Sequence, residues 1–226
     1  LAKKLCEITP GRFSKKVFLC NSGTESVEAA IKYCQARRLR QGEGGQRYSF
    51  VSFEGAFHGR TLGALSLNGS KTKHTRGFFY RDSKTGFPNP LFHSRAFPVY
   101  QIPFPHKYNE DDKKRFLSAV DFNVPWFQIN GCFLELVQGE GGIRVIDEEC
   151  LQRLVKICQD NDIYLVVDEV QTGFKRTGKM FACEWEGISP DLFCIAKGLT
   201  GGYLPLAATL ATDEIYEAFL GDYAEY

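Results

Sequence analysis

The sequence predicts an α/β fold, in which a mostly parallel central sheet carries helices on both faces. Short apolar runs alternate with stretches of helical periodicity along the chain, and no internal repeat or low-complexity segment interrupts them. At 226 residues, 43% of them hydrophobic and 24% charged, the chain is long enough to bury a large core. No linker-like boundary appears, so we expect one domain.

The individual elements follow from these patterns in chain order. The expected strands are residues 17–20, 48–53, 132–137, 164–167, 192–196 and 206–209. Helices are expected at residues 22–40 and 148–159, where apolar side chains recur every three or four positions, and a third begins at Glu214. Residues 70–108 are rich in Phe, Pro, His and Lys without clear periodicity, so we expect an irregular excursion over the surface.

The composition argues against several classes of function. The 28 Lys and Arg against 27 Asp and Glu leave no excess for a basic nucleic-acid surface. No apolar run reaches the ~18 residues that span a bilayer, and the N-terminus lacks the apolar core of a secretion signal. The eight cysteines form no CxxC pair, so we interpret them as free buried thiols rather than disulfides or metal ligands. They indicate an intracellular compartment, either the cytoplasm or the mitochondrial matrix.

Five short segments at expected strand ends could carry chemistry. The first is residues 21–25, between a strand and a helix. Ser22 and Glu25 fit a capping box, which starts a helix without any ligand, and taken alone this interpretation is preferred. Gly23 at this turn would also let backbone N–H groups approach an anion, and a helix N-terminus favours phosphate.

The second and third segments contain an aromatic residue, a histidine and two acids. In residues 55–61, Phe57 beside His58 could stack on a planar ring, although a core Phe and a hydrogen-bonded His explain the same pattern. In residues 135–142, Glu135 and Glu140 accompany a glycine-rich turn. Open α/β sheets bind ligands at the carboxyl ends of their strands, so a functional role gains weight, while solvated loop carboxylates remain the simpler interpretation.

The last two segments are apolar strands that end in a charged residue. One leads into Asp168, whose carboxylate needs a cationic partner. That partner is either an arginine, such as Arg144 or Arg176, or the protonated ring nitrogen of a cofactor. The other leads into Lys197, which is followed by glycines. A lysine there is either a Schiff-base nucleophile or a side chain that extends to solvent.

Together, the five segments hold what pyridoxal phosphate requires. A lysine can hold the cofactor aldehyde as a Schiff base, and an aspartate can keep the pyridine nitrogen protonated so that the ring acts as an electron sink. An aromatic side chain can cover one ring face, and a helix N-terminus can hold the phosphate. We therefore expect this cofactor, and no metal, at the carboxyl edge of the sheet.

With these residues in view, the chain resembles the class-III pyridoxal-phosphate-dependent aminotransferases, of the acetylornithine, ornithine and 4-aminobutyrate group. Lys175 departs from the family pattern, which commonly has Gly there. The resemblance implies the fold of the aspartate aminotransferase large domain, fold type I. It also implies that residues 1–226 are this cofactor-binding domain, with an N-terminal segment before residue 1 and a small domain after residue 226. The matching segments, in the family's order, are residues 21–25, 57–61, 137–142, 168–178 and 196–199.

The resemblance implies a role for each matching residue. Lys197 would form the Schiff base and move the proton, Asp168 would pair with the pyridine nitrogen, and Gln171 would contact the ring hydroxyl. Glu140 would be a gating carboxylate that pairs with an arginine beyond residue 226, and Glu135 a structural acid of the cofactor site. The other expected cofactor contacts are Ser22, Gly23 and Thr24 at the phosphate, Phe57 stacked on the ring and His58 beside it.

The implied reaction moves an amino group from a terminal amine onto 2-oxoglutarate, in a homodimer with shared sites. Glu140 favours ornithine, acetylornithine or 4-aminobutyrate as the donor. Residues 201–210 instead resemble diaminopelargonate (adenosylmethionine-8-amino-7-oxononanoate) aminotransferase of biotin synthesis, which is the alternative. A same-fold aminomutase or racemase and a non-catalytic relative are the competing classes. Neither nucleic acid nor a membrane is expected as a partner.

Overall fold

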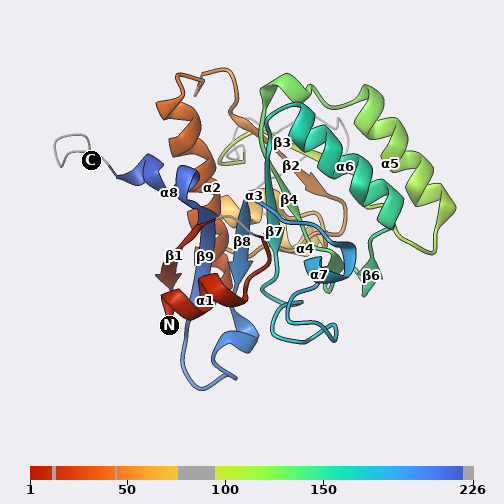
Figure 1. Cartoon of the computed structure of the whole chain (residues 1–226). Coiled ribbons are helices and arrows are strands. Elements are labelled where there is room, and N and C mark those ends of the chain that lie inside the picture. Colours follow the sequence, from red (N-terminus) through yellow and green to blue (C-terminus); the bar gives the residue numbers. More distant parts are fainter. Residues whose placement is uncertain (12–13, 44, 76–94, 221–226) are drawn as a thin grey trace.

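A central sheet of seven strands organises the chain. The computed structural model describes residues 1–11, 14–43, 45–75 and 95–220. The strands lie in the order β1-β9-β8-β7-β4-β2-β3, and β5 (Val137–Gln138) pairs with β6 (Arg144–Val145) in a separate hairpin (Figure 1). The strands of the main sheet are β1 (Lys15–Cys20), β2 (Ser49–Phe53), β3 (Val99–Ile102), β4 (Ile129–Leu134), β7 (Tyr164–Asp168), β8 (Leu192–Ile195) and β9 (Ala207–Thr212).

The strand directions place most carboxyl ends at one edge of the sheet. Strands β8, β7, β4, β2 and β3 run parallel to one another. Within the main sheet, β9 runs antiparallel to both of its neighbours, β1 and β8, so β1 points the same way as β8. The expected mostly parallel sheet is confirmed. Its carboxyl edge, at the bottom of Figure 1, is where the turns after β1, β2, β4, β7 and β8 meet.

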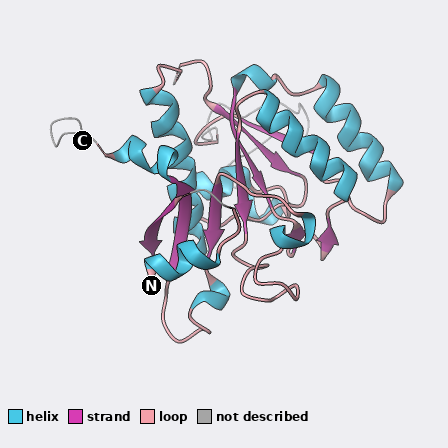
Figure 2. Ribbon diagram, viewed as in Figure 1, coloured by secondary structure: helices cyan, strands magenta, loops and turns pink. Residues whose placement is uncertain are grey.

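Helices cover both faces of the sheet, as expected (Figure 2). One face packs against α2 (Gly23–Arg40) and α3 (Leu62–Leu67). The other packs against α1 (Ala2–Ile8), α5 (Glu110–Phe122) and α6 (Glu148–Asp160). In β4, Phe133 joins the core beneath α2, whereas Cys132 and Leu134 join the core beneath α6. Because both faces are buried, these strands are continuous apolar runs instead of alternating patterns.

Short helical turns complete the described chain. Two of them, α8 and η3, together confirm the helix expected from Glu214. The short elements are α4 (Thr72–Thr75), α7 (Cys183–Glu186), α8 (Asp213–Tyr216) and the 3₁₀ turns η1 (Trp126–Gln128), η2 (Lys197–Leu199) and η3 (Glu217–Phe219).

The structure differs from the sequence expectation most clearly at three places, and it also contains helices α1 and α3, which the sequence patterns do not predict. Strand β4 ends at Leu134 and does not continue to residue 137 as expected. The chain leaves the main sheet there, and residues 137–138 form β5, which pairs with β6. Helix α5 is missed because Phe116, Ala119 and Val120 are its only buried residues. Strand β3 lies within the stretch expected to be irregular, and as an edge strand it buries only Ile102. Residues 76–94 of that stretch lie outside the described residues.

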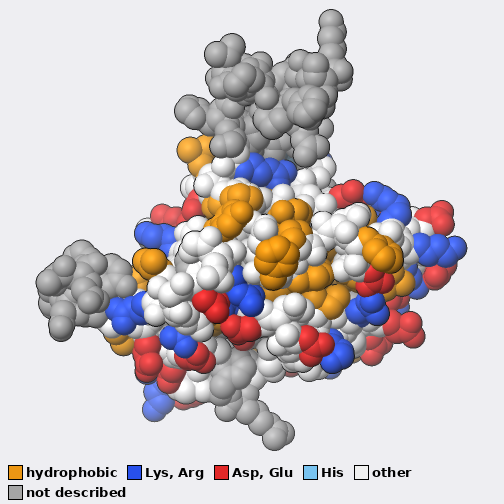
Figure 3. Space-filling view, turned by 90° about the horizontal axis from the view of Figure 1, so that it is seen from above, with side chains coloured by type: hydrophobic (Ala, Val, Ile, Leu, Met, Phe, Trp, Pro, Cys, Tyr) orange, Lys and Arg blue, Asp and Glu red, His pale blue; other side chains and the backbone are white. Residues whose placement is uncertain are grey.

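The cysteines and the surface charges are arranged as the composition predicts. All eight cysteines are free, and six of them are buried. On the described part of the face seen in Figure 3, basic and acidic side chains are interspersed rather than separated. Within the described ranges, no helix combines the length and the apolar character needed to cross a membrane. The same residues contain no group of three or more His, Cys, Asp or Glu that could hold a metal ion.

Candidate functional site

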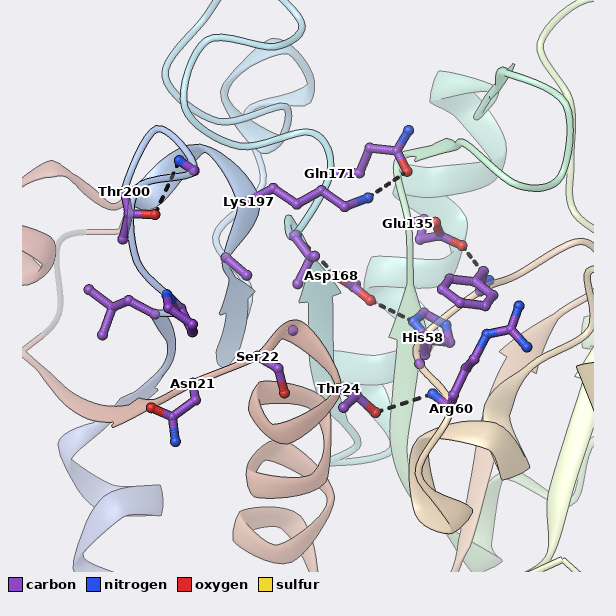
Figure 4. Close-up of a pocket in the computed structure, with 18 of the residues that line it drawn as sticks. Asn21, Ser22, Thr24, His58, Arg60, Glu135, Asp168, Gln171, Lys197 and Thr200 are labelled. Atoms are coloured by element: carbon purple, nitrogen blue, oxygen red, sulfur yellow. Dashed lines mark hydrogen bonds and ion pairs between the residues drawn. The ribbon is translucent and has the colours of Figure 1, made fainter.

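A cavity of about 600 Å³ lies at the carboxyl edge of the sheet (Figure 4). It collects side chains from the turns after β1, β2, β4, β7 and β8, which the parallel arrangement brings to the same edge. Nine of the ten residues that the sequence singles out line this cavity, and Glu140 does not. The nine are Ser22, Gly23, Thr24, Phe57, His58, Glu135, Asp168, Gln171 and Lys197.

Lys197 extends into the cavity from the end of β8. The strand and Ala196 are buried, so the backbone is held firmly up to the point where the chain turns into η2. The side chain itself is exposed, and its Nζ donates a hydrogen bond to Oε1 of Gln171 at 3.3 Å. An exposed primary amine on a rigid strand end, held by a neutral acceptor, is suited to attack a carbonyl group.

Asp168 ends the neighbouring strand, β7, and is 5% exposed. Its Oδ1 accepts a hydrogen bond from the Val170 N–H at 3.0 Å, and its Oδ2 lies 2.8 Å from Nδ1 of His58. In the parallel register Asp168 is opposite Cys194 of β8, shortly before Lys197. The acid and the amine therefore leave adjacent strands at the same edge and line the same cavity.

His58 and Glu135 complete a buried group of ionisable side chains around Asp168. Burial lowers the pKa of His58, but the hydrogen bond to Asp168 and the negative charges of Asp168 and Glu135 outweigh it, so the pKa is raised. Burial also raises the pKa of Glu135 from 4.5 to about 7. The charge of His58 and the hydrogen bond from the Phe57 N–H to Oε2, at 2.9 Å, lower this pKa but do not outweigh burial. The hydrogen bond to Asp168 and the nearby carboxylates therefore favour the protonated form of His58.

The buried Glu135 predicts how stability depends on pH. A carboxyl group whose pKa is raised by folding binds more protons in the folded state, so stability falls as the pH rises from 4.5 to about 7. Glu135→Gln keeps an oxygen that can accept from the Phe57 N–H and cannot ionise. We expect this variant of the cofactor-free protein to melt several degrees higher than wild type at pH 8 and to match it at pH 4.5. For a chain of this size, each kcal/mol of added stability raises the melting temperature by about 2–4 °C.

The half-exposed Glu54, which pairs with Arg115 at 2.9 Å, supplies the control for this experiment. Glu54→Gln removes only an exposed ion pair, so it is expected to change the melting temperature little at either pH value. A Glu135→Gln variant that is less stable than wild type at pH 8 would show that the ionised carboxylate is stabilising, contrary to the raised pKa.

The turn before α2 presents backbone N–H groups to the cavity. The Ser22 Oγ accepts from the Glu25 N–H at 3.4 Å, and the Glu25 carboxylate accepts from the Asn21 N–H at 2.8 Å. The capping box is therefore present. It leaves the N–H groups of Gly23 and Thr24, the first two of the helix, without intrahelical acceptors. Because both residues line the cavity, the two interpretations of this turn are compatible: the box starts the helix, and the helix N-terminus faces the space where an anion could bind.

Gly59 allows a second loop to close against this turn. The Thr24 Oγ1 accepts hydrogen bonds from the N–H groups of Arg60 and Thr61, each at 3.3 Å. Gly59 has φ +140°, and a Cβ there would lie 2.2 Å from the Thr24 Oγ1. Only glycine therefore fits both the backbone conformation and the close approach.

Gly59→Ala is expected to weaken the binding of pyridoxal phosphate by about 10- to 100-fold, the range for hydrogen bonds to a charged group. The added methyl group must push Thr24 and its turn away from the position expected for the phosphate. Binding of pyridoxal, which has no phosphate, should change much less, and both affinities can be measured by fluorescence titration. Gly42→Ala is the matched control, because Gly42 also has a positive φ (+77°) but nothing within 4 Å of its Cβ position. Equal losses for both ligands would contradict a phosphate role.

Glu140 lies outside the cavity wall in this structure. Its Oε2 is 2.6 Å from the Nζ of Lys71, and both side chains are almost half-exposed. The hydrogen bond and the positive charge of Lys71 lower the pKa of Glu140. Gly139 nevertheless abuts the Gln171 side chain, since a Cβ there would lie 2.4 Å from its Oε1, so the turn that carries Glu140 borders the cavity.

Several lining residues were not singled out by the sequence reasoning. Arg60 and Thr200 lie inside or beside recognised segments, but nothing local in the sequence distinguishes them from ordinary loop residues. Val170 packs close to Gly23, where a Cβ would lie 2.8 Å from a Val170 methyl group. The remaining unpredicted lining residues are Asn21, Gly59, Ala196, Gly202, Leu204, Pro205 and Leu206.

Glu169, next to Asp168, does not reach the cavity. Its carboxylate is fully buried and accepts hydrogen bonds from the N–H groups of Ala182 and Cys183 at 3.1 and 2.9 Å, and from the Thr172 hydroxyl. It therefore holds the start of α7 in place. At Lys175 the backbone has φ +66°, which explains why a glycine would be easily accepted there.

The lining residues fit pyridoxal phosphate. The cavity offers a primary amine for the aldehyde in Lys197 and a fixed carboxylate for the ring nitrogen in Asp168. It also offers an aromatic ring, Phe57, and a helix N-terminus with two available N–H groups for the phosphate. Each chemical group of the cofactor thus has a counterpart, and the counterparts come from segments that share one edge of the sheet.

The chain is similar in sequence to known aminotransferases. Residues 1–225 match the family model described as aminotransferase class-III. The chain is 38% identical over 233 residues to an adenosylmethionine-8-amino-7-oxononanoate aminotransferase from Staphylococcus aureus, and 38% identical over 235 residues to one from Anoxybacillus flavithermus. These alignments cover 98% and 100% of this chain. The chain spans about half the length of the curated relatives it matches, 48% in each case.

Solved structures of transaminases share the fold. A thermostable (S)-enantioselective omega-transaminase from Thermomicrobium roseum superposes with a TM-score of 0.81 at 29% identity, over 98% of this chain and 48% of that one. An omega transaminase from Pseudomonas jessenii, solved in complex with PMP, superposes with a TM-score of 0.78 at 28% identity, over 96% of this chain and 47% of that one. The expected fold type is confirmed.

Proposed function

Because the chain belongs to the aminotransferase class-III family, whose members use pyridoxal phosphate, we propose that its cavity binds this cofactor and that the whole protein is a transaminase. The observation that carries the proposal is the shared cavity: Lys197 and Asp168 leave adjacent parallel strands and line one space with the N-terminus of α2. A non-catalytic relative would have no need of both the reactive amine and the buried acid. An aminomutase or racemase would need them, so the choice of amino acceptor must be tested.

Each residue has a task in this proposal. The bound cofactor supplies an electron sink for the bond that breaks at the substrate amine carbon. Lys197 would hold the cofactor through its amine, and the same amine would carry the proton between the substrate and cofactor carbons. Asp168, fixed by His58, keeps a proton on the ring nitrogen. Gly23 and Thr24 hold the phosphate, and Gln171 contacts the ring hydroxyl and orients the Lys197 amine.

The comparisons change the preferred substrate. The ornithine, acetylornithine or 4-aminobutyrate expectation relied on Glu140, which is outside the cavity wall and paired with Lys71. The curated relatives at 38% identity are instead named for adenosylmethionine and 8-amino-7-oxononanoate. We therefore propose the alternative from the sequence: the amino group passes from adenosylmethionine to 8-amino-7-oxononanoate. These relatives are bacterial, which favours the cytoplasm over the mitochondrial matrix.

Half-reactions of the full-length protein test this choice. The pyridoxal form is mixed separately with adenosylmethionine, ornithine, acetylornithine and 4-aminobutyrate, and conversion to the pyridoxamine form is followed by absorbance. Adenosylmethionine should convert it, and 8-amino-7-oxononanoate should convert it back. Rapid conversion by ornithine or 4-aminobutyrate, with reversal by 2-oxoglutarate, would instead establish the first expectation.

Glu140→Gln separates the two substrates by a second route. If Glu140 is a gate that pairs with the arginine beyond residue 226 while the terminal amine binds, its loss should lower kcat/KM for the ornithine or 4-aminobutyrate half-reaction by about tenfold or more and leave the 2-oxoglutarate half-reaction near wild type. Under the proposed adenosylmethionine function, kcat/KM of Glu140→Gln for adenosylmethionine should stay within about twofold of wild type. Lys71→Ala, which removes the partner of Glu140, is the matched variant.

A homodimer is part of the proposal. Three large apolar side chains on segments that contribute to the cavity lining are exposed in the single chain: Tyr203 is 91% exposed, Leu204 72% and Leu62 61%. A second subunit would cover such side chains. The molar mass of the full-length protein in solution, measured by light scattering, tests this part.

A further inference from the structure

His74 is a buried histidine that the proposed reaction does not use. It lies on the short helix α4, in the stretch whose sequence shows no clear periodicity, and it is 4% exposed. Its Nδ1 lies 3.1 Å from the Oγ of Ser70, which fixes the orientation of the ring. His74 does not line the cavity, so any effect on the site must pass through a neighbour.

That neighbour is Phe57, the aromatic residue of the cavity wall. The two rings meet edge to face, with centroids 5.3 Å apart and planes inclined by 68°. The backbone of Phe57 is fixed by its hydrogen bond to Glu135, but Phe57 lies in a loop, where neither a helix nor a strand restricts its side chain. The guanidinium carbon of Arg60 is 5.8 Å from the ring centroid and is itself exposed, so it restrains the ring less than a buried side chain does.

We propose that His74 is a positioning residue that sets the tilt of the Phe57 ring over the cofactor ring, with Ser70 holding His74 in turn. The inference rests on the proposed function, since it needs a cofactor under Phe57. Edge-to-face packing has a preferred geometry, so a fixed His74 ring transmits that geometry to Phe57. In this way the segment 70–75 shapes the cavity without contacting its contents.

The test uses the full-length protein loaded with pyridoxal phosphate. The readouts are the affinity for the cofactor and its induced circular dichroism in the visible range, which reports how the bound ring is held. His74→Ala should raise the Kd about two- to tenfold, the range for loss of an aromatic pair, and reduce the induced signal by half or more. His74→Phe, which restores a ring edge, should recover most of the affinity and most of the induced signal. Ser70→Ala should give values between those of His74→Ala and His74→Phe.

His106 supplies a matched control. It forms a similar edge-to-face pair with Tyr108, with centroids 5.7 Å apart and an angle of 79°, and neither residue lines the cavity. His106→Ala should change neither readout. If His74→Ala also changes neither, or if His74→Phe is as defective as His74→Ala, the positioning role is wrong. If wild type itself shows no induced visible signal with pyridoxal phosphate, the proposed function fails instead.

Discussion

Replacement of Lys197 by alanine is expected to abolish the visible absorbance of bound pyridoxal phosphate and to lower kcat by about 10⁴-fold or more. The variant loses both the amine that holds the cofactor and the group that moves the proton, and proton transfer alone is worth about 10²–10⁴-fold. The side chain is exposed and makes one hydrogen bond, to Gln171, so folding should not suffer. Absorbance spectra and single-turnover rates of the full-length protein measure the effect.

Lys156→Ala provides the control for this experiment. Lys156 is an exposed lysine on α6 that pairs with Asp160 at 2.9 Å and does not line the cavity. Its replacement should leave the spectrum and the rate unchanged. Retention of both the colour and most of the rate in Lys197→Ala would mean that another lysine holds the cofactor.

Asp168→Asn is expected to lower kcat/KM by about 10²- to 10⁴-fold. The amide has nearly the same shape but cannot balance the positive charge of a protonated ring nitrogen, and breaking a buried ion pair costs about 3–5 kcal/mol, or about a factor of ten for every 1.36 kcal/mol. The change also removes the negative charge that raises the pKa of His58. The His58 pKa, followed by NMR in the cofactor-free protein, should therefore fall in the variant.

Asp191→Asn is the matched control for Asp168. Asp191 accepts a hydrogen bond from the Leu165 N–H at 2.8 Å and lies outside the cavity lining. An amide oxygen can accept the same bond, so activity should stay near wild type. Activity of Asp168→Asn within about threefold of wild type would contradict the pairing with the ring nitrogen.

The sheet and the main site could be predicted because their signals are local. Strands β7 and β8 are apolar runs that end abruptly in Asp168 and Lys197, and parallel strands bring such ends to one edge without further information. The capping box before α2 is likewise visible within a few residues. Helix α5 escaped prediction because its outer face is polar and only one narrow stripe is buried.

Contacts between distant segments could not be predicted from local patterns. His58 meets Asp168 across 110 positions in the chain, and Glu140 meets Lys71 across 69. The sequence shows a charge in each case but not which partner balances it. Because the sequence does not show that Glu140 pairs with Lys71, it favours a gating role for Glu140 and with it an ornithine-type substrate.

Borohydride reduction tests the central claim most directly. The full-length protein is loaded with pyridoxal phosphate, reduced, digested and analysed by mass spectrometry. We predict a phosphopyridoxyl group on the peptide that contains Lys197, and its absence from every other lysine. A modified peptide elsewhere in the chain, or no modification at all, would contradict the assignment of this cavity as the cofactor site.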